Sequence, residues 1–97
     1  MTINYKPARI RVVCKDGFSI SIQAGRAHNS DPRNDDGPYS HVEWGFPSSP
    51  DVLLIPFAED SNFVRSIYPY VPADVIDKVI RLHGVIESGE LPELLLV

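Results

Sequence analysis

Apolar and polar residues alternate along two short stretches that an Asp-Gly pair separates. The apolar positions of these stretches are Ile10, Val12, Cys14, Phe18, Ile20 and Ile22. A period of two is typical of a strand that buries one face and exposes the other. Asp16-Gly17 favours a two-residue hairpin turn, because both residues tolerate positive φ. The pattern therefore predicts an antiparallel hairpin over residues 8–23 with one polar face.

Two further stretches have the character of strands. Residues 41–46 alternate again, and their buried face would consist of Val42, Trp44 and Phe46. Residues 52–57, with the sequence VLLIPF, are apolar throughout, which predicts a fourth strand buried on both faces. Pro56 places the end of that strand at a sheet edge or a bulge, because proline cannot donate to a ladder.

A helical period appears only near the end of the chain, over residues 72–83. Its apolar stripe consists of Val75, Ile76, Val79 and Ile80, with Leu82 beside it. Pro72 suits the first helical position, and Gly84 suits a C-terminal stop. We expect residues 58–70 to be irregular, with Tyr68-Pro69-Tyr70 extended. The tail over residues 91–97 fits either a last strand or a docked turn.

These elements predict an α+β fold, with a four- or five-stranded, mainly antiparallel sheet and one C-terminal helix packed on one face. The chain has 97 residues, of which 43% are apolar and 23% charged. Such a length and composition suit a single domain over residues 1–97 with one modest core. The other face of the sheet, or the long loop between the second and third strands, is then available for function.

Charge and cysteine content narrow the function classes. The net charge of −4 disfavours a dedicated phosphate-backbone binder, so we expect no direct nucleic-acid binding. Cys14 is the only cysteine and is expected to be a small buried apolar residue. No stretch reaches the roughly 20 apolar residues of a membrane span, and the N-terminus lacks a signal-peptide core. We therefore expect a cytoplasmic protein.

The loop over residues 24–40 carries most of the candidate chemistry. Loops longer than about 12–15 residues in compact domains are mostly functional or disordered. Turn formation alone would account for its Asn, Asp, Gly and Pro residues, with Arg33 pairing with Asp31 or Asp35. The functional interpretation is that the loop presents side chains to a partner, with Arg33 and Tyr39 solvated. The candidate partner-binding residues are Arg26, His28, Arg33, Asp35, Asp36 and Tyr39, together with Tyr68 and Tyr70 before the helix.

Catalytic and metal motifs are incomplete. A calcium loop aligned on Gly37 lacks its first ligand, because Pro32 stands there, and the flanking helices are absent. A zinc site on His28 and His41 would need two more ligands supplied by the fold. Either histidine could form a pair with Glu43, but the chain has no hydrolase or phosphate-binding motif. We therefore predict no catalytic residue, no metal and no cofactor.

The most specific motifs of the chain lie within residues 18–86. They are Pro32-Arg33, Gly37-Pro38-Tyr39, Val42-Glu43, Gly45-Phe46-Pro47 and Tyr70-Val71-Pro72. Together they resemble a group of small hypothetical proteins of unknown function encoded by tailed bacteriophages. In that group a tyrosine and a cysteine follow the loop histidine, whereas Asn29 and Ser30 follow His28 here. A function carried by that pair would be lost or changed in this chain.

The resemblance implies a phage gene expressed in the bacterial host cytoplasm, and it brings no established activity. It favours an accessory protein that binds and inhibits a bacterial host protein through the 24–40 loop. That host protein could be a defence effector of the CRISPR kind. The alternative is a small protein or enzyme that binds an anionic ligand with Arg26, His28, Arg33 and His41. The apolar tail offers a surface for a homodimer.

Overall fold

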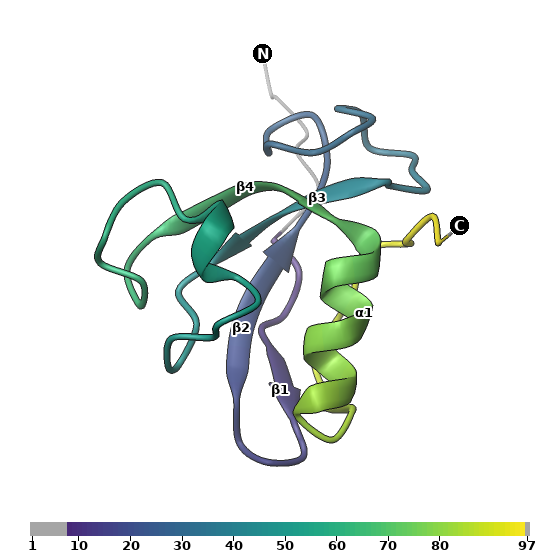
Figure 1. Cartoon of the computed structure of the whole chain (residues 1–97). Helices are drawn as coiled ribbons and strands as arrows, with labels where there is room; N and C mark the ends of the chain where they lie inside the picture. Colours follow the sequence, from purple (N-terminus) through teal and green to yellow (C-terminus); the bar gives the residue numbers. More distant parts are fainter. Residues whose placement is uncertain (1–7, 97) are drawn as a thin grey trace.

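Five short strands form one antiparallel sheet in the computed structural model, which describes residues 8–96 (Figure 1). The elements are β1 (Val12–Cys14), β2 (Ser19–Gln23), β3 (His41–Gly45), the 3-10 helix η1 (Ile55–Phe57), β4 (Ile67–Pro72), α1 (Ala73–Leu82) and β5 (Ile86–Ser88). The strand order is β4-β3-β2-β1-β5, and each neighbouring pair is antiparallel. The predicted fold class, with one helix near the C-terminus, is confirmed.

The predicted β1–β2 hairpin forms, but its turn spans residues 15–17 rather than Asp16-Gly17 alone: the Gly17 amide donates to Cys14 O at 2.9 Å, and of the pair only Gly17 has positive φ. The Cys14 amide donates to Phe18 O at 2.8 Å, and Asp16 Oδ1 accepts a hydrogen bond from the Phe18 amide at 2.9 Å. Gly17 has φ +95°, which a residue with a side chain rarely adopts. Val12 and Ile20 then pair across the two strands with both side chains fully buried.

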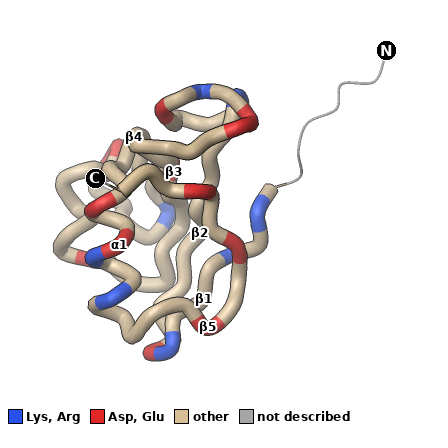
Figure 2. The backbone as a smooth tube through the Cα atoms, turned by 90° about the vertical axis from the view of Figure 1, so that its right-hand side faces the viewer, with Lys and Arg blue, Asp and Glu red and all other residues tan. Residues whose placement is uncertain are grey.

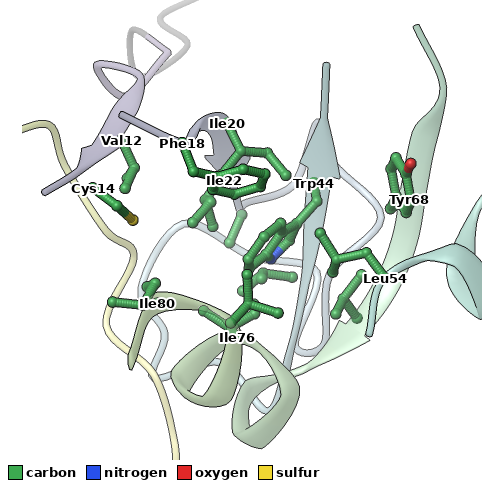
Figure 3. Packing of buried hydrophobic residues seen from close by; sticks show 14 of the residues in the cluster. Val12, Cys14, Phe18, Ile20, Ile22, Trp44, Leu54, Tyr68, Ile76 and Ile80 are labelled. Carbon is green, nitrogen blue, oxygen red and sulfur yellow. The ribbon is translucent and has the colours of Figure 1, made fainter. Parts of the chain in front are cut away.

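The core lies between the sheet and α1, with Trp44 at its centre (Figure 3). Ile76 and Val79 of the predicted stripe are fully buried, and Ile80 is almost so, whereas Leu82 is 63% exposed. Cys14 is also buried, as expected for a small apolar residue. The helix forms because this stripe recurs with the helical period and covers the apolar face of the sheet.

The prediction of a strand over residues 52–57 is wrong. Asp51 instead starts a turn that leads into η1: its Oδ1 accepts the Leu53 amide at 2.9 Å, and its carbonyl accepts the Leu54 and Ile55 amides. Of the residues in the run, only Leu54 is fully buried, whereas Val52 is 76% exposed. A short apolar run does not distinguish a strand from a turn that buries one residue, and here the turn formed.

Both sheet edges differ from the expected arrangement. The segment around Tyr68-Pro69-Tyr70 belongs to the edge strand β4 rather than to an irregular stretch, although Tyr70, with φ +51°, departs from the expected extended backbone. The other edge is β5, which the sequence pattern did not indicate. β3 ends at Gly45, so Phe46 does not share the buried face of Trp44: it has φ +53° and is 50% exposed.

Candidate functional site

The 24–40 loop folds back on itself through hydrogen bonds and one ion pair. Asp35 forms a salt bridge with Arg26 at 3.2 Å and accepts the Arg26 amide at 3.1 Å. Arg33 Nε donates to the carbonyl of Arg26 at 3.3 Å. Ser30, which is buried, accepts the Gly25 amide at 3.1 Å. Because these contacts join the two halves of the loop, its backbone has a defined shape despite the absence of regular structure.

Glu43 of β3 fixes the middle of the loop to the sheet. Its Oε2 lies 2.8 Å from His28 Nδ1, and its Oε1 accepts a hydrogen bond from Asn29 Nδ2 at 3.0 Å. The His28 and Glu43 side chains are only 28% and 17% exposed. The pairing of a loop histidine with Glu43 therefore forms, and it has the geometry of a structural contact that orders the loop.

The expectation that Tyr39 is solvated is wrong. Its ring is 2% exposed, and its hydroxyl donates to Asn34 O at 2.7 Å. Its backbone pairs with the C-terminal tail, because its amide donates to Glu93 O and its carbonyl accepts the Leu95 amide, both at 2.8 Å. Tyr39 thus joins the loop to the tail from inside the molecule.

The two tyrosines before the helix differ in burial. Tyr68 is fully buried, and its hydroxyl donates to Phe63 O, so it has no surface to offer a partner in this structure. Tyr70 is 46% exposed and has φ +51°. Its amide donates to Asn29 O at 3.1 Å, which holds it against the loop. Of the three predicted tyrosines, only Tyr70 is available for contact.

The exposed predicted residues form what we call the loop surface: Arg26, Arg33, Asp36 and Tyr70. Figure 2 shows basic and acidic residues around this loop at the end of the sheet. His28 and Asp35 are partly buried and hold the loop through their ion pairs with Glu43 and Arg26. The structure therefore separates the predicted set into exposed residues, supporting residues and the two buried tyrosines.

The four cationic candidates of the anionic-ligand hypothesis all make contacts within the protein, and Arg33 Nε donates to the Arg26 carbonyl. Arg26 pairs with Asp35, and His28 pairs with Glu43. His41 Nδ1 lies 2.9 Å from Ser40 Oγ, at a cleft of about 330 Å³ beside the start of α1. Over residues 8–96, no group of three or more His, Cys, Asp and Glu side chains is placed to hold a metal ion.

A second cluster, which sequence reasoning missed, surrounds His83 at the end of α1. His83 Nδ1 lies 2.6 Å from Asp16 Oδ2, and His83 Nε2 lies 2.7 Å from Asp51 Oδ2. The ring stacks on Phe18 with centroids 4.0 Å apart. We call this cluster the His83 bridge. His83 is 67 positions from Asp16 and 32 positions from Asp51 along the chain, so no local motif could have indicated this cluster.

The fold and the loop surface define a small α+β protein with a preformed polar loop. Comparison of the chain with protein-family models, curated proteins and solved structures found no match. In the part of the chain that the structure describes, no helix has the length and apolar character needed to cross a membrane.

Proposed function

We propose that this protein is a stoichiometric binding protein that docks on another protein through the loop surface. The single observation that carries the proposal is Tyr70, an aromatic ring 46% exposed in a backbone conformation that disfavours side chains. Such a conformation costs on the order of 1–3 kcal/mol and is concentrated at functional sites. Tyr70 lies at the register shift between β3 and β4, and its amide bonds to Asn29 of the ordered loop.

Contact through side chains, rather than strand addition, fits the edges of the sheet. In β4, Pro69 and Pro72 lack amide donors, and the Tyr70 amide is already bonded to Asn29. At the opposite edge, β5 has only three residues. Neither edge offers the row of backbone groups that strand addition needs. A partner would therefore be recognised by the side chains of the loop surface.

The order of the loop favours binding without a large entropic cost. Its contacts with Glu43, Ser30 and Asp35 exist before a partner arrives, so less conformational freedom is lost on association. Exposed charges at Arg33 and Asp36 would then act on the association rate and its salt dependence. The aromatic ring of Tyr70 would act on the dissociation rate.

The identity of the partner is proposed from the phage resemblance alone. In that setting the partner is a bacterial host protein in the host cytoplasm, such as a defence effector, and binding inhibits it. The coarser proposal of a protein-binding surface does not depend on this setting. It rests on the geometry of the loop and Tyr70.

The test is capture of a partner by tagged protein from bacterial lysate, followed by titration of the purified pair. Tyr70→Asn should keep or raise stability, because asparagine adopts positive φ more readily. The same change should weaken binding by about 10- to 100-fold, as expected when an aromatic contact residue is lost. Lys78→Ala, on the outer face of α1, is the matched surface control and should leave affinity unchanged.

Binding should saturate at one protomer per target site. Two results would contradict the proposal. One is a Tyr70→Asn protein with unchanged affinity for the captured partner. The other is loss of target activity at substoichiometric amounts of protein, which would support the alternative of a small enzyme.

A further inference from the structure

The His83 bridge joins three parts of the chain that are distant in sequence. Asp16 belongs to the β1–β2 turn, Asp51 starts the turn before η1, and His83 follows α1. Each carboxylate uses one oxygen within its own turn and the other on the imidazole. Asp16 Oδ1 accepts the Phe18 amide, and Asp51 Oδ1 accepts the Leu53 amide, both at 2.9 Å. The imidazole is therefore the shared donor between two turns.

The bridge needs a proton on both ring nitrogens. At 2.6 and 2.7 Å, each nitrogen is at the distance of a charge-assisted hydrogen bond to a carboxylate. A neutral imidazole has only one N–H, so its other nitrogen would direct a lone pair at a carboxylate. The observed geometry is that of an imidazolium, and its stack on Phe18 also suits a cation.

The two carboxylates differ in their access to water. The Asp16 side chain is 47% exposed and can rotate into solvent when the imidazole loses a proton. The Asp51 side chain is 4% exposed, and His83 is the one cation with which it forms an ion pair among the described residues. Loss of the imidazolium charge leaves a buried carboxylate without a counter-charge, which is strongly unfavourable. Asp51 regains water only if its own segment moves.

We propose that the His83 bridge is a pH-sensitive latch, which holds residues 51–57 on the end of α1 while the imidazole is protonated and loosens them when it is neutral. The element that moves is the turn that Asp51 starts, including η1. Its inward contact is Leu54, which is fully buried in the core. Opening would therefore expose Leu54 and weaken the cover over that part of the sheet.

The charged and titratable groups around the ring agree with this assignment. Burial alone would lower the pKa of His83, but the hydrogen bonds to Asp51 and Asp16 and the charges of these two residues raise it overall. Four other titratable or charged residues lie close to members of the bridge. Cys14 interacts with the charge of Asp16, and Tyr68 interacts with that of Asp51. Lys15 lies beside Gly84, and the carbonyl of Arg81 accepts the His83 amide. The pKa of Cys14 is raised by burial and then by the charge of Asp16. The pKa of Tyr68 is raised by burial and then by the charges of Asp51 and Asp60. Deprotonation of Cys14 and of Tyr68 is therefore moved to higher pH than in a free side chain.

The test measures amide exchange by NMR on the full chain, corrected for intrinsic rates. The reporters are the amides of Leu53, Leu54 and Ile55, which all bond to Asp51. Their protection should fall by about tenfold or more between about pH 6 and about pH 9, with the midpoint of the His83 ring titration. The β2 amides of Ile20 and Ile22 should fall by less than this.

Two variants separate the latch from a general effect of pH. Asp51→Asn removes the buried charge with little change of shape, so protection at residues 53–55 should no longer depend on pH. His28→Gln is the matched control, because it breaks the other histidine–carboxylate pair and should leave the pH dependence intact. The proposal is overturned if Asp51→Asn keeps the wild-type dependence, or if His28→Gln abolishes it.

Should Asp51→Asn fail to fold, the wild-type protein still decides the matter. Two slowly exchanging ring N–H resonances of His83 at low pH, lost together with protection at residues 53–55, would support the latch. Protection that changes at a pH unrelated to the His83 titration would overturn it. This inference concerns the stability of a segment outside the loop surface, so the experiment tests it independently of the proposed partner binding.

Discussion

At the scale of single residues, glycines show most directly how tightly this fold constrains the chain. Gly89 follows β5 with φ +104°, and a Cβ built there would collide with Arg11 O and lie 2.6 Å from Val12 Cα. Gly45 in β3 is different, because a Cβ there would meet nothing within 4 Å and its φ is not positive. The first glycine is required by backbone contact, whereas the second is not required by packing.

We therefore expect Gly89→Ala to lower the free energy of unfolding by roughly 2–4 kcal/mol, through backbone strain and a clash with β1. Gly45→Ala is the matched control and should raise stability by up to about 1 kcal/mol, because alanine has less conformational freedom to lose. Urea denaturation of both variants measures the difference. Equal denaturation midpoints and slopes for the two variants would show that the backbone of β1 does not approach Gly89 this closely.

At the scale of elements, the amphipathic helix α1 contributes Ile76, Val79 and Ile80 to the core. Ile76 is fully buried against the sheet, in contact with the cluster that contains Trp44. Leu82, one turn and a half further along, is 63% exposed. The two residues are close in size and differ mainly in burial, so they make a clean comparison.

Ile76→Ala should destabilise the protein by roughly 2–5 kcal/mol, because it removes buried methyl groups and leaves a cavity. Leu82→Ala should change the free energy of unfolding by less than about 0.5 kcal/mol, as is usual for surface positions. Both values come from the denaturation midpoint at constant slope. A small loss for Ile76→Ala would mean that the stripe does not face the sheet.

At the scale of the whole molecule, the His83 bridge should make the free energy of unfolding fall both at alkaline pH and at acidic pH. The pKa of His83 is higher in the folded state than in the unfolded state. Its contribution to stability is therefore complete below the pKa of the unfolded state, and it is lost as the pH rises through the pKa of the folded state. The folded pKa of Asp16 is lowered, first by the hydrogen bond from the Phe18 amide and then by that from His83. Its contribution is present above the unfolded pKa and is lost as pH falls through the folded value.

Urea denaturation across the pH range should therefore show maximal stability at mildly acidic to neutral pH, with a decline on the alkaline side that coincides with His83. His83→Gln should flatten that alkaline decline. An alkaline decline of unchanged size in this variant would assign it to another group.

Much of this architecture follows from local sequence patterns. The alternation around Asp16-Gly17 determines the hairpin, since period and turn chemistry act between near neighbours. The 3.6-residue stripe and Pro72 determine the helix to within a residue at each end. The 24–40 loop was also recognisable as the feature without regular structure, because its composition excludes a strand or a helix.

Other features depended on contacts between distant parts of the chain. Residues 51–57 form a turn instead of a strand because Asp51 accepts the backbone amides of the residues that follow it. His83, which is 32 positions away along the chain, holds this turn through its contact with Asp51. Tyr39 is buried because the C-terminal tail pairs with its backbone, which the loop sequence alone cannot indicate. Periodicity and turn preference are local properties, so the sequence by itself determined the hairpin and the helix. The burial of Tyr39, the exposure of Tyr70 and the His83 bridge were decided only by tertiary structure, because each depends on which remote segment lies opposite.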